Sequence, residues 1–277
     1  MVFLKKFFLK LIFLVLDVFY VKVMRRYPIL YFDSVANVGD QINPYLIRKI
    51  TNRKPYNVKS KLVRHLVGLG SMFHMANKRS IIWGTGIISN LPSFSSKIDY
   101  YEVLAVRGEL TKDVLLSSPK GVKNDIALGD PGLLLPIFYH PSVKKKRKIG
   151  LVPHYVDACN PYIRSSDEVY VIDVSLDPES FVDELLSCEF ILSSSLHGLI
   201  LADAYGIPNK WVFFSDKVTG GYFKYQDYYS TTDAKNEDFV FIDSGSRLEH
   251  LVSKIEDFVS VKRYLFDLNS LLRAFPK

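Results

Sequence analysis

Short apolar runs alternate along the chain with segments whose apolar residues recur at helical spacing. The runs predict buried strands, and the segments between them predict helices. Strands are expected at residues 29–32, 81–83, 104–106, 126–128, 149–152, 169–174, 190–192 and 211–214. Because the alternation occurs on both sides of a basic run at 144–148, the sequence predicts two doubly wound α/β domains, 27–143 and 144–277, that face one another across a cleft.

Helices are expected where a capping residue precedes a periodic apolar stretch. Asn43 followed by Pro44 is an N-cap and N1 pair, and Asp177 followed by Pro178 is another. Two further stretches have helical spacing, one at 62–69 within a basic, irregular segment and one at 247–275, where one or two terminal helices are expected.

The segment 215–232 is polar and rich in Gly and Tyr, so we expect a mobile loop. Its tyrosines suit the faces of sugar rings, and the loop could therefore close over a glycan. Ordinary packing of the tyrosines is the alternative.

Residues 1–26 are strongly apolar but are interrupted by charges, among them Lys10, Asp17 and Lys22. The longest uncharged run, 11–16, is far shorter than the ~20 apolar residues that a membrane-spanning helix needs. No small-residue cleavage site follows, so a secretory signal is not expected. The pattern predicts a basic amphipathic helix that lies in a membrane interface, with a helix packed on the domain as the alternative.

The composition indicates which classes of partner the protein can bind and in which compartment of the cell we expect it. With 277 residues, of which 48% are hydrophobic, the chain can bury two cores of ordinary size. A net charge of +7 favours phosphorylated substrates, acidic glycans or a membrane surface, whereas no nucleic-acid-binding module is recognisable. Cys159 and Cys188 have no metal-ligand spacing, so we expect neither a metal site nor a disulfide framework. We therefore expect the protein in the reducing cytoplasm.

The stretch 188–208 contains the most specific pattern in the chain. An apolar run ends in three serines, 193–195, and a helical pattern begins at Leu196. His197 is therefore expected in the first turn of a helix, just beyond the carboxyl end of a strand. Free backbone N–H groups and the helix dipole favour a phosphate or carboxylate there. In the alternative interpretation Ser195 only caps the helix and His197 only packs.

Five short motifs follow one another along the chain. They are NVGDQIN at 37–43, WGTGI at 83–87, AVRGELT at 105–111, LGDPGLLLP at 128–136 and SSSLHGLILADAYGIP at 193–208. Together they resemble the motifs of the polysaccharide pyruvyl transferase family. The resemblance implies a GT-B-like arrangement of two Rossmann-like domains, phosphoenolpyruvate as the donor, and a pyruvate ketal on a sugar of a surface polysaccharide or its lipid-linked precursor.

The resemblance also assigns roles to residues of these motifs. Catalysis is expected from Arg107 as the donor-binding cation, His197 as the proton donor and Asp40 as a base. Salt bridges from Arg107 to Glu109 or Asp113 and capping by Asp40 are the structural alternatives. Donor binding is expected from Arg107, Ser194, Ser195, Leu196, His197 and Gly198. Acceptor binding is expected from Asn37, Asp40, Asn43, Gly84, Thr85 and Gly86 of the motifs and from Lys217 of the loop 215–232, and no metal or cofactor is required.

Two other functions fit the same residues. A glycosyltransferase on the same two-domain architecture would use the helix start for the diphosphate of a nucleotide sugar. A non-catalytic, membrane-associated subunit of a polysaccharide assembly system would depend mainly on residues 1–26, and Arg107 and His197 beside intact glycine turns argue against it. The expected partners are phosphoenolpyruvate, an oligosaccharide or lipid-linked glycan, and the inner face of a membrane.

Overall fold

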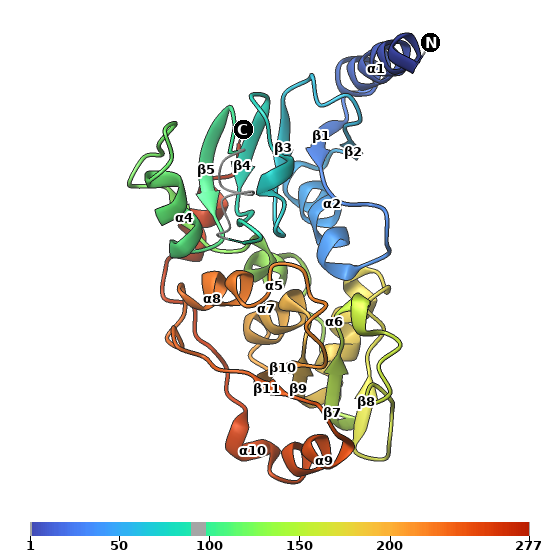
Figure 1. Ribbon diagram of the computed structural model, residues 1–277, viewed down its shortest axis with the longest axis vertical. Coiled ribbons are helices and arrows are strands. Elements are labelled where there is room, and N and C mark those ends of the chain that lie inside the picture. The colour runs from blue at the N-terminus through green and yellow to red at the C-terminus, as the bar shows by residue number, and fades with distance from the viewer. Residues whose placement is uncertain (1, 90–97, 277) are drawn as a thin grey trace.

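Two parallel β-sheets are stacked along the long axis of the molecule in the computed structural model, which describes residues 2–89 and 98–276 (Figure 1). The first sheet has six strands in the order β2-β1-β3-β4-β5-β6, and the second has five in the order β11-β10-β9-β7-β8. Helices cover the faces of both sheets. The predicted α/β class with two Rossmann-like domains is thus confirmed.

The first sheet is built by residues 27–128. Its strands are β1 Tyr27–Leu30, β2 Pro55–Asn57, β3 His65–Val67, β4 Ser80–Trp83, β5 Glu102–Val106 and β6 Ala127–Leu128. The helices that accompany it are α2 Val38–Thr51 and α4 Glu109–Leu116, with α1 Val2–Val18 and the π-helical turn η1 Phe19–Val23 ahead of β1, and the short helices η2 Phe73–Met75, η3 Pro131–Leu134 and α5 Leu135–Phe138.

The second sheet is built by residues 147–241. Its strands are β7 Arg147–Val152, β8 Val169–Val171, β9 Cys188–Ser193, β10 Asn209–Phe213 and β11 Val240–Phe241. The helices of this half are η4 Tyr155–Asp157, α6 Pro178–Leu186, α7 Leu196–Ala204, α8 Phe223–Tyr229, α9 Gly245–Ser253, α10 Ile255–Phe258 and α11 Leu268–Arg273.

Several predicted elements are confirmed by the local geometry. Asp177 caps α6 by accepting hydrogen bonds from the N–H groups of Glu179 and Ser180. The strand that ends in serines is β9, and α7 follows it with Ser195 as its N-cap. Gly206 has φ +68°, the left-handed conformation in which a chain leaves a helix at low cost. These elements were predictable because their signals are local.

One predicted helix is wrong, and another begins earlier than predicted. Residues 65–67 form β3, which pairs with β1 and β4 in the middle of the sheet, so tertiary pairing overrides the helical spacing at 62–69. The helix expected to start at Asn43 begins at Val38 instead, because the side chain of Asn37 accepts a hydrogen bond from the Gly39 N–H and caps it earlier. Asn43 is therefore a buried residue within α2.

The loop expected to be mobile at 215–232 contains α8, whose tyrosines are core residues. Tyr225 stacks on Trp211 with ring centroids 4.5 Å apart and donates a hydrogen bond to the Ser194 carbonyl. Tyr228 donates to Asp203 Oδ2 at 2.9 Å. The packing interpretation is correct for Tyr225, Tyr228 and Tyr229, whose rings are fully buried, whereas Tyr222, just before α8, is 47% exposed.

The C-terminal segment of the chain returns to the first sheet, so that α11 lies behind β4 and β5 (Figure 1). The Trp83 indole N–H donates to the Leu271 carbonyl at 2.9 Å, and the Phe275 ring packs edge-on against the indole. The terminal segment holds three short helices where one or two were expected. This crossing ties the two halves together.

Candidate functional site

A cavity of about 410 Å³ lies where the carboxyl edges of the two sheets face one another. The first half contributes the segment after β1, the start of α2 and the segment 70–75 after β3. The second half contributes His154 after β7, the start of α7 and Lys224 of α8. Open α/β sheets bind ligands at this edge, so the cavity is the candidate site.

His197 is held at the cavity wall by a close fit to α2. A Cβ on residue 39 would lie 2.1 Å from His197 Nδ1, so Gly39 is what admits the ring. Burial, aided by the positive charges of Arg107 and Lys224, lowers the pKa of His197 to about 3. The imidazole is therefore neutral at pH 7 when the cavity holds no anion.

Asp130 is the carboxylate that faces His197. Its Oδ2 lies 3.9 Å from His197 Nε2, and neither atom has a hydrogen-bond partner among the described residues. The other oxygen, Oδ1, accepts from the Gly132 N–H at 2.9 Å. Burial raises the pKa of Asp130 to about 6. At this distance the two side chains are not hydrogen-bonded to each other. Either one can take up a proton when a bound ligand changes the local charge.

Lys224 brings a buried amine to the cavity. The residue is 7% exposed, and among the described residues no ion pair includes it. Burial, reinforced by the charge of Arg107, lowers the pKa of Lys224 to about 7. Its Nζ lies 3.5 Å from Nε2 of His154, a ring whose pKa burial lowers to about 3. An amine without a carboxylate partner is suited to bind an anion.

Asp40 lines the cavity from the first turn of α2. Its Oδ2 accepts a hydrogen bond from Asn37 Nδ2 at 3.2 Å. Burial raises the pKa of Asp40 to about 6, against the lowering effects of Asn37 and Lys224. A carboxylate with such a pKa is a better proton acceptor near neutral pH than an ordinary aspartate.

The start of α7 reaches the cavity through Ser195, Leu196 and His197. Ser194 faces away from it, because its hydroxyl accepts from the His154 N–H at 2.8 Å. Gly198 packs closely on Val152 and Ser193, where a Cβ would collide. Of the predicted donor-binding residues at this corner, the structure thus places three on the wall and two behind it.

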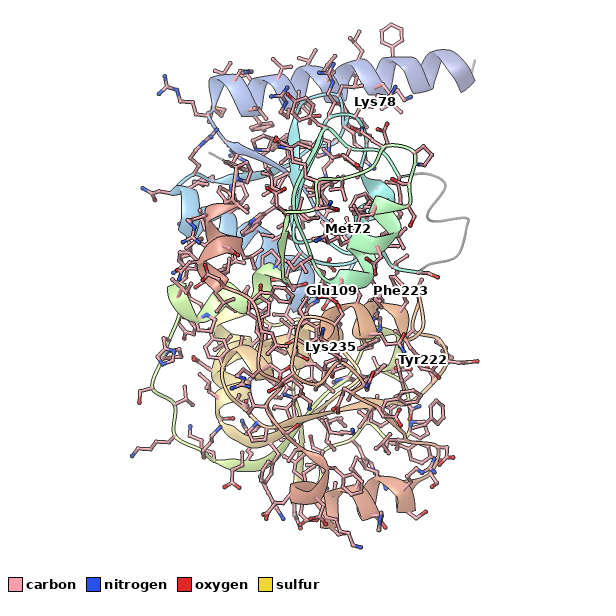
Figure 2. All side chains as sticks on the ribbon, turned by 90° about the vertical axis from the view of Figure 1, so that its left-hand side faces the viewer. Met72, Lys78, Glu109, Tyr222, Phe223 and Lys235 are labelled. Atoms are coloured by element: carbon pink, nitrogen blue, oxygen red, sulfur yellow. The ribbon has the colours of Figure 1, made fainter. Side chains whose placement is uncertain are left out.

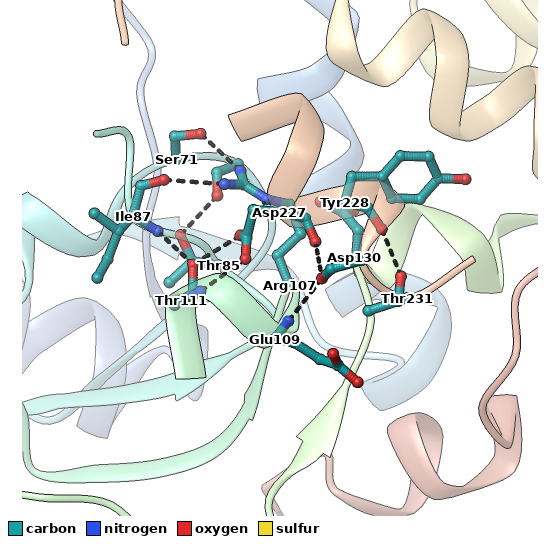
Figure 3. A network of polar contacts seen from close by, with 12 residues as sticks. Ser71, Thr85, Ile87, Arg107, Glu109, Thr111, Asp130, Asp227, Tyr228 and Thr231 are labelled. Carbon is teal, nitrogen blue, oxygen red and sulfur yellow. Dashed lines mark hydrogen bonds and ion pairs between the residues drawn. The ribbon is translucent and has the colours of Figure 1, made fainter. Parts of the chain in front are cut away.

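Arg107 is fully buried behind the cavity wall, and Figure 3 shows the polar contacts of its guanidinium. Its guanidinium donates to Asp227 Oδ2 at 2.9 Å, Ser71 Oγ at 2.7 Å and the Ile87 carbonyl at 2.9 Å. The ion-pair partner is thus Asp227 of α8 rather than Glu109 or Asp113. Asp227 also accepts from Thr111, so this cluster joins α4 and β5 of the first half to α8 of the second.

A second ion pair crosses the junction at the surface, between Lys235 and Glu109 (Figure 2). The two halves also share a core in which Val38 and Ile42 of α2 pack with Val152 and Phe181. The walls of the cavity are therefore held together by buried contacts, and the relative position of Lys224 and His197 is fixed by packing.

The predicted acceptor-binding residues are only partly brought together. Asn37 and Asp40 line the cavity. Asn43 is buried and donates to the Leu69 carbonyl, and the Thr85 hydroxyl donates to the Gly70 carbonyl at 2.8 Å, so both support the segment after β3. Gly84 and Gly86 pack against Pro131 and Arg107, and Lys217 is an exposed residue. None of these last five residues, from Asn43 to Lys217, is among the described residues that line the cavity.

Three polar residues of the site were missed by sequence reasoning. His154 follows a strand, and Asp130 lies inside the motif at 128–136, so their positions after apolar runs were available as signals. Lys224 lies among tyrosines in a segment interpreted as a mobile loop, and its burial depends on the packing of α8. A buried lysine has no signature in the sequence.

The described residues lack two other kinds of feature. They contain no cluster of three or more His, Cys, Asp or Glu side chains arranged to hold a metal ion. Within the same residues, no helix combines the length and the apolar character needed to cross a bilayer.

Comparison with known proteins gives four findings. Residues 4–211 match the family model described as polysaccharide pyruvyl transferase. An uncharacterised protein of Acanthamoeba polyphaga mimivirus is 34% identical over 220 residues, 76% of this chain and 75% of that protein. The succinoglycan biosynthesis protein ExoV of Rhizobium meliloti is 28% identical over 177 residues, 60% of this chain and 53% of ExoV.

One solved structure, of a functionally uncharacterised Klebsiella pneumoniae protein, superposes with a TM-score of 0.46 at 14% identity and covers 83% of this chain and 98% of that protein.

Proposed function

Because the chain belongs to the polysaccharide pyruvyl transferase family, we propose that it transfers pyruvate from phosphoenolpyruvate to two hydroxyls of one sugar in a surface polysaccharide or its lipid-linked precursor. The relative ExoV is named for succinoglycan biosynthesis, which supports a polysaccharide as the product. The reaction is expected on the cytoplasmic side of the membrane, where phosphoenolpyruvate is made.

The observation that carries the proposal is the buried amine of Lys224 opposite the start of α7. Phosphoenolpyruvate has a phosphate and a carboxylate on one enol carbon, so a site for it needs a cation and an anion cradle close together. Lys224 supplies the cation, and the first N–H groups of α7 with the Ser195 hydroxyl supply the cradle. Arg107 acts indirectly from behind the cavity wall, because its ion pair with Asp227 positions α8, the helix that carries Lys224.

His197 is the proposed proton donor. Its pKa of about 3 describes the empty cavity, where burial and two cations disfavour the imidazolium. A bound phosphate and carboxylate reverse that charge balance, so donor binding raises the pKa of His197, and the facing Asp130 stabilises the imidazolium. His197 is therefore protonated only when the donor is bound.

The proposed reaction forms two C–O bonds at the enol carbon of phosphoenolpyruvate, the first by addition and the second by displacement. His197 protonates the methylene carbon of phosphoenolpyruvate, so that the adjacent carbon becomes electrophilic and a sugar hydroxyl adds to it. A second hydroxyl of the same sugar then displaces hydrogen phosphate and closes the ketal. One hydroxyl proton passes to Asp40 and returns to His197 by way of solvent, and the other leaves with the phosphate.

The acceptor occupies the α2 side of the cavity in this scheme. Asp40 is placed to take the hydroxyl proton, and Asn37 orients it through the hydrogen bond to Oδ2. The volume of about 410 Å³ is within the range of ligand pockets and exceeds what a three-carbon donor fills, which leaves room for a sugar.

The test compares donors and then follows turnover. Calorimetry should show binding of phosphoenolpyruvate and none of UDP-glucose, because the glycosyltransferase alternative requires the reverse. Incubation with extracted lipid-linked glycans should give phosphate release and a mass increase of one pyruvyl group. Binding of UDP-glucose without binding of phosphoenolpyruvate would replace this proposal by glycosyl transfer, and binding of neither would favour the non-catalytic alternative.

A further inference from the structure

The helix α1 presents an apolar stripe that the rest of the molecule does not cover. The residues of this stripe recur at helical spacing along α1 and the turn after it, and each is between 43% and 61% exposed: Phe8, Leu11, Ile12, Val15, Val18 and Phe19. Figure 2 shows the helix lying across one end of the molecule with side chains that point away from the body. A stripe of this size in water is a binding surface.

The opposite side of α1 is fixed to the first sheet. The carboxylate of Asp17 is fully buried and accepts hydrogen bonds from Tyr56, the N–H groups of Lys59 and Ser60, and the Ser60 hydroxyl. Tyr20 stacks on Tyr56 with ring centroids 4.7 Å apart. The one acidic side chain of the segment 8–26 is therefore turned inward, and the apolar stripe is held facing outward.

A row of cations lies at the same end of the molecule. In a parallel sheet the amino ends of all strands meet at one edge, and basic residues precede four neighbouring strands there: Arg25 and Arg26 before β1, Lys54 before β2, Arg64 before β3, and Lys78 and Arg79 before β4. All but Arg26 are exposed. Lys78 is seen close below α1 in Figure 2.

This basic edge ends at β4. The next strand begins at Glu102, and Asp99 ahead of it is paired with Lys120 at 2.9 Å. Neighbouring strands are about 4.8 Å apart, so the cations of the basic edge extend over roughly 15 Å. The spacing of adjacent strands is shorter than the screening length of about 8 Å at physiological salt, so the cations of neighbouring strands act together on one surface.

We propose that α1 and the basic edge together bind an anionic lipid surface, with α1 lying flat in the interface and the basic edge facing the headgroups. The apolar stripe supplies the buried surface, and the cations select negative charge. The candidate site lies at the carboxyl edge of the same sheet, so a membrane bound at the amino edge leaves the cavity open. The inference stands independently of the reaction proposed above.

The test measures partition of the full chain onto vesicles. Vesicles of phosphatidylcholine and phosphatidylglycerol at 7:3 should sediment the protein, and vesicles of phosphatidylcholine alone should sediment at least tenfold less. The double variant Ile12→Asp with Val15→Asp should lose at least about tenfold in partition without a change in melting temperature, because both side chains point away from the body. Leu116→Asp with Ile137→Asp, which alters exposed apolar residues elsewhere, is the matched control and should bind normally.

A second pair of variants tests the basic edge. Lys54→Gln with Lys78→Gln should reduce partition about tenfold at low salt and much less at 0.5 M salt, because each cation contributes through charge alone. Lys144→Gln with Lys146→Gln removes the same charge from the exposed run before β7 and should change little. Equal binding to neutral vesicles would overturn the proposal. So would a chain that ignores vesicles but dimerises through Ile12 and Val15, since a second copy would then cover the stripe.

Discussion

Replacement of Lys224 by methionine should stabilise the empty protein and weaken donor binding at the same time. Methionine keeps most of the length of the side chain and removes the amine. A residue that serves packing alone gives the opposite result, in which stability falls and donor binding is retained. The two measured changes together therefore identify the role of Lys224.

The size of the stability gain follows from the pKa of Lys224. Burial lowers this pKa from 10.5 to about 7. One pKa unit corresponds to about 1.4 kcal/mol, so keeping the amine charged in the empty cavity costs on the order of 5 kcal/mol. The cost is fully present below pH 7, where both folded and unfolded chains carry the proton, and it disappears as the pH rises to 10.5. Lys224→Met should thus gain most below pH 7 and least at pH 10.

The loss in donor binding has a different pH dependence. A charge-assisted contact contributes roughly 1.5–3 kcal/mol, so Lys224→Met should weaken phosphoenolpyruvate binding roughly 10- to 150-fold at pH 6.5. In the native protein the affinity should decline as the pH rises above about 7, because binding then requires the amine to take up a proton. The variant should lack this component of the decline.

Calorimetry with phosphoenolpyruvate between pH 6 and 9 and chemical denaturation of the same samples provide the measurements. Lys217→Met is the matched control, since it removes a lysine from the exposed segment near α8 and should alter neither quantity. A Lys224→Met protein that is less stable and binds phosphoenolpyruvate normally would refute the assignment of Lys224 as the donor cation.

Three further predictions concern the neighbouring residues. Gly39→Ala should reduce turnover about 10²-fold with the fold intact, because its Cβ displaces the His197 ring, whereas Gly245→Ala, with open space around it, should be neutral in both assays. His197→Gln should bind phosphoenolpyruvate and lower turnover roughly 10²–10⁴-fold; near-normal turnover would exclude it as the acid. Arg107→Lys should cost about 1–3 kcal/mol in urea unfolding, because lysine keeps the charge but cannot reproduce the hydrogen bonds of the planar guanidinium, and an equally stable variant with weak donor binding would instead support direct donor contact.

The sequence by itself determined the elements whose signals are local. The apolar runs before Asp130, His154 and the serines at 193–195 each became a strand, and the N-caps Asp177 and Ser195 each began a helix. Parallel strands bring their carboxyl ends to one edge, so residues after those strands could be expected near a common site. The rule places His197 and Asp40 at this edge, and both line the cavity.

Only the tertiary structure decided which groups face the cavity and which stand behind it. Arg107 follows its strand as predicted, yet it is turned toward Asp227, 120 residues later, because α8 packs against α4. The same packing removes the Lys224 amine from water and places it in the cavity that the start of α7 also lines. Burial and the distance between groups far apart in the chain are properties of the packed fold, and they set both pKa values and partners.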